Sequence, residues 1–310
     1  MALESDLLLE QQKMRRRIIL WRCISFFIFF AAIITVGFFL QTKEMRGDHL
    51  AKITIEGVIG SDVSKRIDLF EKALKDNSVK GLILYVNSPG GTVTGGEQLH
   101  EEMVRFAKQK PVAVVMGSVA ASAGYMISVP AQRIFASNST LTGSIGVIMQ
   151  SPDFSVLLDK VGVNVDQFVS GPMKGQPSMV KPISPEGKKM LQGLISDMYD
   201  QFIIMVAEGR HMSYQNVQQL ADGRPYTGKQ ALKIGLIDQI GNERNAKAWF
   251  IEKYHLKKDI KVAELKEEKK LKWTDSLMNG TVGYLFNGLL SKIVNNKTTR
   301  LDGALAIWQP

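Results

Sequence analysis

The chain of 310 residues is poor in cysteine and histidine. Its one cysteine, Cys23, excludes an intrachain disulfide and a cysteine-rich metal site. The four histidines are His49, His100, His211 and His255. They are scattered along the chain and show no HExxH or other paired spacing, so the sequence predicts no metal and no other cofactor.

Residues 49–252, where the core must lie, also carry little net charge. The net charge is +9, but residues 49–252 carry 21 basic and 19 acidic groups, whereas residues 253–310 carry 11 and six. The basic excess is therefore mostly a C-terminal feature, and we expect no nucleic-acid partner for the main body. Hydrophobic residues make up 45% of the chain, which suits one large or two smaller globular units.

A long uncharged run, residues 23–40, follows a basic cluster near the N-terminus. As a helix of about 18 residues it spans about 27 Å, enough to cross a hydrocarbon core. Because few basic residues follow the run, the positive-inside rule keeps residues 1–22 in the cytoplasm and puts the chain from about residue 45 outside. We expect an uncleaved transmembrane signal anchor at residues 23–42. A cleaved signal peptide is the alternative, but the run is long for one and lacks a small-x-small cleavage pattern.

From residue 49 onward, strand patterns alternate with helix patterns. The expected strands are residues 51–59, 79–86, 111–116, 133–136, 145–149 and 163–169, and the expected helices are residues 64–74, 94–110, 155–161, 184–208, 214–220, 229–234 and 245–255. This alternation predicts an α/β fold with a mostly parallel, buried sheet in a domain at residues 49–257. Residues 258–310 form a tail that is either a solvated helix with a docking segment or a helix for a membrane surface or a partner.

Two corners rich in small residues follow consecutive buried strands. One is Pro89-Gly90-Gly91, and the other is Ala121-Ser122-Ala123-Gly124. Equivalent ends of parallel strands open on the same crevice, so Ser122 could supply a nucleophilic hydroxyl there, while the N–H groups of Gly91 and Ala123 converge on a developing oxyanion. The alternative for the serine corner is tight packing without chemistry.

A nucleophilic serine needs a base, and no histidine lies between His100 and His211. A lysine can serve when burial disfavours its charged form. Lys174 is the candidate, because it lies in an apolar, glycine-flanked loop directly after an expected strand, and Ser144 could orient it by hydrogen bonding. The alternatives are that Lys174 is an ordinary exposed lysine of a loop, and that Ser144 only stabilises a turn by local hydrogen bonds.

Five motifs in this order and spacing resemble the signal peptide peptidase A (protease IV) family in its short, single-repeat, membrane-anchored form. They are Asn87-Ser88-Pro89-Gly90-Gly91, Met116-Gly117-Ser118-Val119-Ala120-Ala121-Ser122-Ala123-Gly124-Tyr125, Leu141-Thr142-Gly143-Ser144-Ile145-Gly146-Val147, Ser170-Gly171-Pro172-Met173-Lys174, and Ala221-Asp222-Gly223-Arg224-Pro225-Tyr226-Thr227-Gly228 with the following Ala231-Leu232-Lys233-Ile234-Gly235-Leu236-Ile237-Asp238. The resemblance covers residues 52–251 and leaves the tail unmapped.

This resemblance implies a serine endopeptidase in which Ser122 is the nucleophile, Lys174 the base, Ser144 the residue that orients the lysine, and Gly91 and Ala123 the oxyanion donors. It implies a Clp protease/crotonase-like fold with stacked, mostly parallel sheets flanked by helices and preceded by one transmembrane helix. It also implies peptide substrates, namely cleaved signal peptides and other extended apolar peptides. The family forms homo-oligomeric rings, in which serine and lysine can come from neighbouring subunits.

The implied location is the bacterial inner (plasma) membrane, with a single pass and an extracytoplasmic (periplasmic) catalytic domain. The Clp protease shares two of the motifs but requires a histidine downstream of its serine, which this chain lacks in range. Two further alternatives stay open. One is a crotonase-type acyl-CoA enzyme, which the anchor topology disfavours. The other is a catalytically silent, membrane-bound ring scaffold.

Overall fold

The computed structural model describes residues 20–22, 24–33, 35, 47–267 and 305–307, which fall into two units, Met1–Asp48 and His49–Pro310. In the first unit, the described residues 20–22, 24–33 and 35 are helical. None of the helices in the described ranges is long and apolar enough to span a membrane. The anchor expected at residues 23–42 lies partly outside the described residues.

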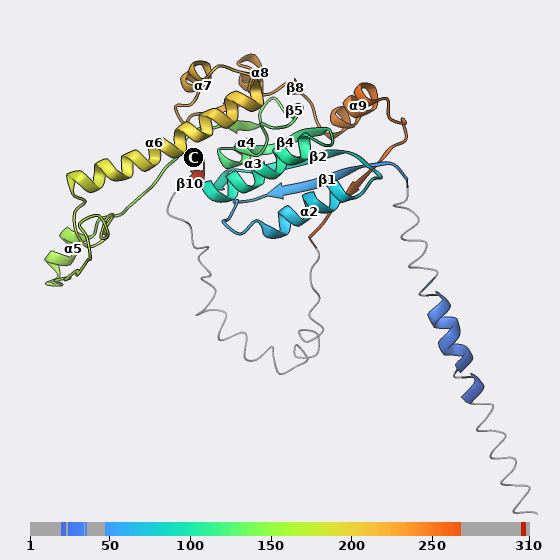
Figure 1. Cartoon of the computed structure of the whole chain (residues 1–310), viewed down its shortest axis with the longest axis horizontal. Coiled ribbons are helices and arrows are strands. Elements are labelled where there is room, and N and C mark those ends of the chain that lie inside the picture. The colour runs from blue at the N-terminus through green and yellow to red at the C-terminus, as the bar shows by residue number, and fades with distance from the viewer. Residues whose placement is uncertain (1–19, 23, 34, 36–46, 268–304, 308–310) are drawn as a thin grey trace, which may run out of the picture. The chain divides into compact units, whose positions relative to one another are not determined.

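The second unit is built on an eight-stranded sheet in the order β7-β6-β4-β2-β1-β9, with β5 paired to β4 and to β8 (Figure 1). The strands of this sheet are β1 (His49–Glu56), β2 (Val79–Ser88), β4 (Val112–Ala121), β5 (Arg133–Ala136), β6 (Leu141–Gly143), β7 (Pro225–Thr227), β8 (Gln239–Ile240) and β9 (Lys261–Glu264). All pairs are parallel except β6 with β7. The mostly parallel α/β architecture predicted from the sequence is therefore confirmed.

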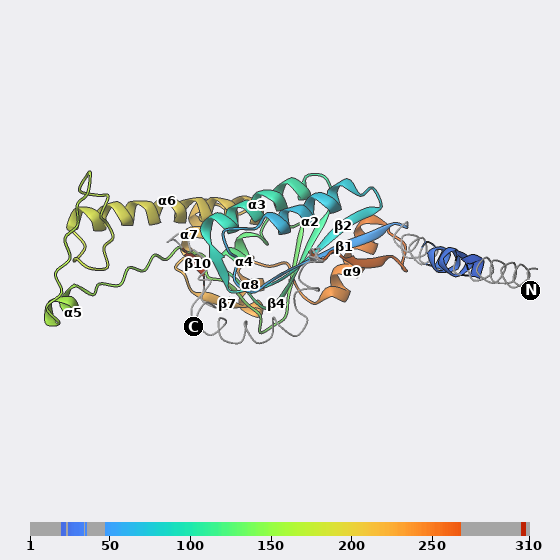
Figure 2. The same ribbon diagram turned by 90° about the horizontal axis from the view of Figure 1, so that it is seen from below.

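Helices cover both faces of the sheet (Figure 2). The helices of the second unit are α2 (Ser64–Lys75), α3 (Val93–Ala107), α4 (Ala123–Met126), α5 (Ser155–Lys160), α6 (Pro185–Arg210), α7 (Tyr214–Leu220), α8 (Gly228–Lys233) and α9 (Glu243–Tyr254). Alternate residues of a strand point to opposite faces. Leu82 and Leu84 of β2 accordingly pack with α2 and α3, whereas Ile83 packs with Phe250 of α9.

Two small strands lie outside the main sheet. β3 (Gly90–Thr92) directly follows β2, and it pairs in antiparallel fashion with β10 (Leu305–Ile307). Neither was predicted, because three residues are too few to show hydrophobic alternation, and two of the three residues of β3 are glycines. The sheet also continues past residue 257, since β9 pairs with β1.

The strand expected at residues 163–169 is wrong. These residues form no regular structure, and all of them are exposed. Strand propensity reflects packing against a neighbouring strand and a core, and neither is present at this segment. The strand expected at residues 145–149 is likewise absent, and the neighbouring three-residue β6 joins the sheet instead.

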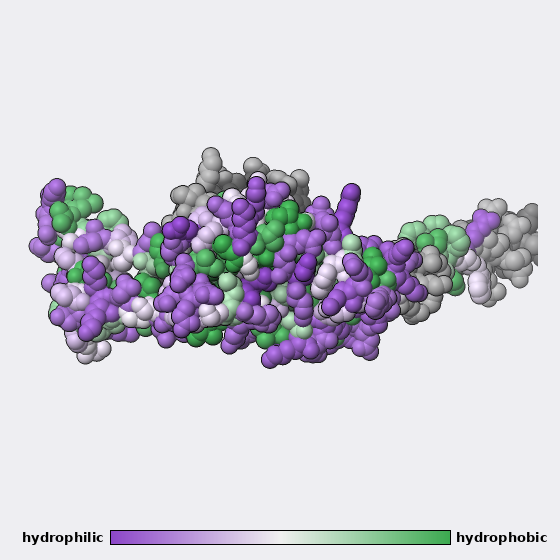
Figure 3. Space-filling view, turned by 90° about the horizontal axis from the view of Figure 1, so that it is seen from above, coloured by the Kyte–Doolittle hydropathy of each residue, from purple (hydrophilic) through white to green (hydrophobic). Residues whose placement is uncertain are grey.

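Residues 150–197, which we call the arm, project from the body of the second unit (Figure 1). They contain α5 and the first half of α6, a helix of 26 residues and thus about 39 Å long. α6 is buried mainly near its end, at Phe202, Ile203 and Val206. The arm exposes many large apolar side chains, seen in part in Figure 3: Phe154, Val156, Leu157, Val161, Val163, Val165, Phe168, Val169, Met179, Ile183 and Leu194.

Candidate active site

Ser122 lies at the sharp turn between β4 and α4. Its φ of 53° and ψ of −120° fall in a region that residues with a β-carbon rarely adopt. The turn is held by backbone hydrogen bonds, because the Ser122 N–H donates to the Gly143 carbonyl at 2.8 Å and the Ser122 carbonyl accepts from Tyr125 at 2.9 Å and Met126 at 2.8 Å. A strained serine between a strand and a helix is the geometry of a nucleophile elbow.

The hydroxyl of Ser122 is buried without a partner. The residue is 1% exposed, and its Oγ makes no hydrogen bond to any described residue. An unpartnered buried hydroxyl costs free energy. Such an arrangement is typical of a site that awaits a further group.

The corner at residues 87–91 lies directly beside this serine. Ser88 at the end of β2 pairs with Ala120 of β4, and a β-carbon on Gly124 would come 2.8 Å from the Ser88 carbonyl oxygen. The two corners predicted to open on one crevice are therefore neighbours. Ala123 is the first residue of α4, so its N–H has no acceptor within the helix.

Gly91 occupies a position that only glycine fits. A β-carbon there would come 1.9 Å from the carbonyl oxygen of Ile59, which lies along β3 and forms an isolated parallel bridge with Gly91. The peptide groups on either side of Gly91 bond to Ile59, because the Gly90 carbonyl accepts from the Ile59 N–H and the Thr92 N–H donates to the Ile59 carbonyl, both at 2.8 Å.

Ser144 and Lys174 are not brought together within the chain. Ser144 has a positive φ of 47° and is 6% exposed, and its Oγ donates to the Gly223 carbonyl at 3.1 Å. Lys174 lies in a turn of the arm, where its N–H donates to the Gly171 carbonyl at 3.0 Å. Its side chain is exposed and makes no hydrogen bond or ion pair with any residue that the structure describes.

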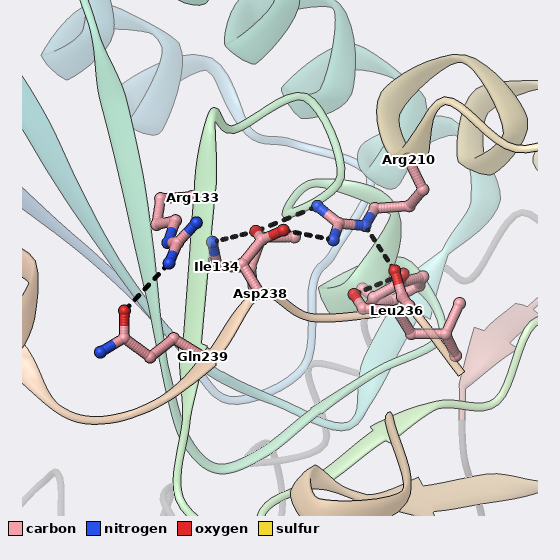
Figure 4. A network of polar contacts seen from close by, with 8 residues as sticks. Arg133, Ile134, Arg210, Leu236, Asp238 and Gln239 are labelled. Atoms are coloured by element: carbon pink, nitrogen blue, oxygen red, sulfur yellow. Dashed lines mark hydrogen bonds and ion pairs between the residues drawn. The ribbon is translucent and has the colours of Figure 1, made fainter. Parts of the chain in front are cut away.

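Figure 4 shows a polar network, not predicted from the sequence, in which Arg210 at the C-terminal end of α6 contacts Asp238. The Tyr125 hydroxyl donates to the Leu236 carbonyl at 2.9 Å, and Arg210, in the last turn of α6, donates to the Gly235 carbonyl at 3.1 Å. Arg210 also forms an ion pair with Asp238 at 2.7 Å. Asp238 lies at the end of one of the motifs quoted above, which is the signal that pointed to it.

His100 lies in α3 and is buried. It is 8% exposed, and its Nδ1 donates to the Met126 carbonyl at 2.8 Å. Burial lowers the pKa of the His100 imidazole, which favours the neutral form. Its bond is to the end of α4, and it makes none to Ser122.

The described part of the chain contains no group of three or more His, Cys, Asp or Glu side chains placed to hold a metal ion. Its parallel sheet, its elbow serine and its glycine-bearing neighbour corner together define a hydrolase site on a Clp protease-like fold. The Clp protease family model matches residues 50–142, and the peptidase family S49 model matches residues 105–257.

Similarity to known proteins shows the family to which the chain belongs. A Synechocystis protein named "Putative protease" is 36% identical over 207 residues, which are 67% of this chain and 75% of that protein. An Enterococcus faecium protein named "Putative signal peptide peptidase SppA" is 34% identical over 280 residues, or 84% of this chain and 76% of that protein. Among solved structures, a ClpP1 mutant from Listeria monocytogenes is 19% identical with a TM-score of 0.44, and the match covers 66% of this chain and 98% of that one. The chain belongs to peptidase family S49, the signal peptide peptidase A family, and it is a serine peptidase.

Proposed function

We propose that the chain is a membrane-anchored endopeptidase in which Ser122 and Lys174 form the catalytic dyad. The strained backbone and the unpartnered, buried Oγ of Ser122 are the observation that carries this proposal. A serine in this state needs one external base, and the S49 motifs that surround Lys174 favour that lysine over the scattered histidines. Residues 1–22 are then the cytoplasmic segment, residues 23–42 the anchor and residues 49–257 the protease domain. The tail, residues 258–310, adds β9 to the edge of the sheet of that domain.

The proposed reaction begins when the Ser122 Oγ attacks the peptide carbonyl carbon while the Lys174 Nζ takes the hydroxyl proton. The N–H groups of Gly91 and Ala123 stabilise the oxyanion that forms. As the carbon–nitrogen bond breaks, Lys174 returns the proton to the leaving amine. A water molecule then attacks the acyl-enzyme by the same proton route and releases Ser122.

The dyad forms between subunits in this proposal. Lys174 is on the exposed arm, whereas Ser122 lies in the core of the body, and no described contact joins them. In a homo-oligomeric ring, the arm of one subunit reaches the serine corner of the next. Docking there removes water from the lysine, as a lysine base requires, because burial disfavours the ammonium form. Ser144 is the residue that then orients the lysine.

The proposed substrates are extended apolar peptides, including cleaved signal peptides. A parallel sheet with a short strand beside the serine suits a peptide that adds as a further strand, with backbone hydrogen bonds supplying affinity. The apolar run and the charge asymmetry at the N-terminus support an anchor in the bacterial inner membrane, with the protease domain on the periplasmic side.

Mutation and subunit mixing test the dyad. Hydrolysis of a fluorogenic apolar peptide by the detergent-solubilised chain should be abolished by Ser122→Ala and by Lys174→Ala, and neither variant should melt below the wild type. Mixing the two variants should restore part of the activity, because about one interface in four of a mixed ring combines an intact serine with an intact lysine.

The matched control for this experiment is Lys181→Ala, another exposed lysine of the arm. It should retain activity. Unchanged hydrolysis in Ser122→Ala or in Lys174→Ala would contradict the dyad. A mixture that stays inactive while both single variants form rings would contradict the sharing of sites between subunits.

A further inference from the structure

A pocket of about 850 Å³ lies between α9 and the strands β5 and β8, and we call it the α9 pocket. Arg133, the first residue of β5, lines this pocket and pairs with Ala113 near the start of β4, whereas Ser122 follows the end of β4. Nine residues of strand separate Ala113 from Ser122, which is roughly 30 Å. The α9 pocket is therefore separate from the serine corner, and its volume is in the range of small-molecule sites.

Arg133 brings an unpaired positive charge to the α9 pocket. Its Nη2 donates to the side-chain oxygen of Gln239 at 3.2 Å, and its side chain makes no other hydrogen bond or ion pair with any described residue (Figure 4). The neighbouring Arg210, in contrast, forms an ion pair with Asp238 at 2.7 Å. A guanidinium that meets a neutral amide in place of a carboxylate keeps its charge and its donors for a ligand.

One wall of the α9 pocket is a face of α9. Asn245, Trp249, Glu252 and Lys253 line it, and their spacing of three and four residues puts them on the same side of the helix. Lys253 is exposed and has no hydrogen bond or ion pair to the part of the chain that the structure describes, so it is a second available cation. Trp249 and Tyr254 add an aromatic wall, with ring centroids 5.5 Å apart.

Hydrogen-bond donors dominate the lining of the α9 pocket. Arg133 and Lys253 are cations, and Glu252 is the only carboxylate among the lining residues. The Gln239 oxygen is used by Arg133, which leaves the amide NH₂ group as a further donor. These donors come from two strands and a helix. Such an arrangement suits a tetrahedral oxyanion better than a planar carboxylate, which a single guanidinium fork can satisfy.

We propose that the α9 pocket binds the phosphate group of an organic ligand. The phosphate oxygens accept hydrogen bonds from Arg133 and Lys253, and the organic part of the ligand packs against Trp249 and Tyr254. A phosphate of this kind can belong to a soluble phosphate ester or to the headgroup of an anionic phospholipid. The proposal does not depend on the catalytic dyad, because the pocket and the serine corner lie at opposite ends of β4.

The fluorescence of Trp249 reports on this site directly. In the full-length chain in neutral detergent, Trp21, Trp273 and Trp308 are replaced by phenylalanine, so that Trp249 is the only tryptophan. The chain is titrated at constant ionic strength with glycerol phosphate and, separately, with micelles that contain increasing amounts of phosphatidylglycerol. Sodium acetate controls for a planar carboxylate, and diacylglycerol controls for a lipid without phosphate.

A saturable change of Trp249 fluorescence is expected with at least one of the two phosphate probes. A response to glycerol phosphate assigns a soluble ester as a sufficient ligand, and a response to phosphatidylglycerol alone assigns the lipid headgroup. Arg133→Gln and Lys253→Gln should each raise the dissociation constant about tenfold, as expected for the loss of a charge-assisted hydrogen bond. Glu252→Gln should lower it, because this change removes a negative charge beside the bound anion.

The matched control is Arg244→Gln, at an exposed arginine in the first turn of α9 that does not line the pocket. It should leave the dissociation constant unchanged, and an equal loss of binding in this variant would overturn the proposal. The absence of saturation with both phosphate probes would do so too, as would equal binding of acetate or of diacylglycerol. Because Lys253 and Glu252 are exposed, their variants test the site even if Arg133→Gln does not fold.

Discussion

Ser122 holds a backbone conformation, φ 53° and ψ −120°, that a β-carbon makes unfavourable. The same residue buries a hydroxyl that has no described partner. Both features cost stability in the free chain, and the second leaves the Oγ without a described hydrogen-bond partner, so that it can bond to a base. Stability and the proposed catalytic role therefore oppose each other at this residue.

We predict that Ser122→Gly raises the free energy of unfolding by about 1 kcal/mol, because glycine adopts this conformation without strain and the gain exceeds its greater unfolded-state entropy. Ser122→Ala removes the unpartnered hydroxyl but keeps the β-carbon, so its stability should lie between those of the wild type and the glycine variant. Thermal unfolding of the three proteins checks this order. A glycine variant that melts below the alanine variant contradicts the strain argument.

At the scale of elements, His100 joins α3 to the end of α4 through its bond to the Met126 carbonyl. The pKa of His100 is lowered by burial from its usual 6.5. Below pH 6.5 the unfolded chain therefore binds a proton that the folded chain does not, and the stability from this group is lost as the pH falls.

We predict that acidification from pH 7.5 to pH 5 destabilises the wild type more than His100→Gln, because glutamine can still donate to the carbonyl but does not titrate. Melting temperatures of both proteins across this range measure the difference. His255→Gln is the control, because it makes the same substitution at a histidine that is exposed, at the end of α9. Parallel curves for the wild type and His100→Gln would contradict the prediction.

The elements that the sequence predicted well are those with strong local signals. α6 begins where Ser184 and Pro185 predicted it, and the Ser184 Oγ accepts from the Gly187 N–H at 2.9 Å. The long parallel strands were predicted because both of their faces are apolar. β3 and β10 have no such pattern, since their partners lie far apart in the sequence and only the fold brings them together.

Some residues of the candidate site could be predicted from the sequence, and others could not. Ser122 and Gly91 stand out in the sequence as small-residue corners after buried strands, and the structure makes these corners neighbours. The Arg210–Asp238 ion pair escaped notice because charged residues 28 positions apart give no local pattern. His100 escaped because the acidic residues around it resemble a solvent-facing helix, although α3 packs against both α2 and α4.

At the scale of the whole molecule, the arm is the feature that suits a monomer least, because it leaves apolar side chains exposed to water. It exposes a set of apolar side chains, among them Phe168, which is 95% exposed. An unusual number of exposed apolar side chains in one segment indicates an interaction site. In the proposed ring, a second copy of the chain would cover them.

We predict that Phe168→Ser weakens assembly by about 2 kcal/mol per interface, as expected for an aromatic anchor, and lowers peptide hydrolysis in parallel. The melting temperature of the body should not change, because this side chain is almost fully exposed. Light scattering after gel filtration measures the assembly. Leu232→Ser in α8, at an apolar side chain 39% exposed and outside the arm, is the control. Intact assemblies of the Phe168→Ser variant would exclude this contact.

The distance in the fold between Lys174 on the arm and Ser122 in the core has a consequence for how the proposed enzyme would be kept in check. With the proposed dyad, a newly made chain that is still alone would carry two half-sites and no working one, so it would not cleave its neighbours. Latency of this kind needs no propeptide and no inhibitor. Crowding of the chains in the membrane would itself be the activating signal.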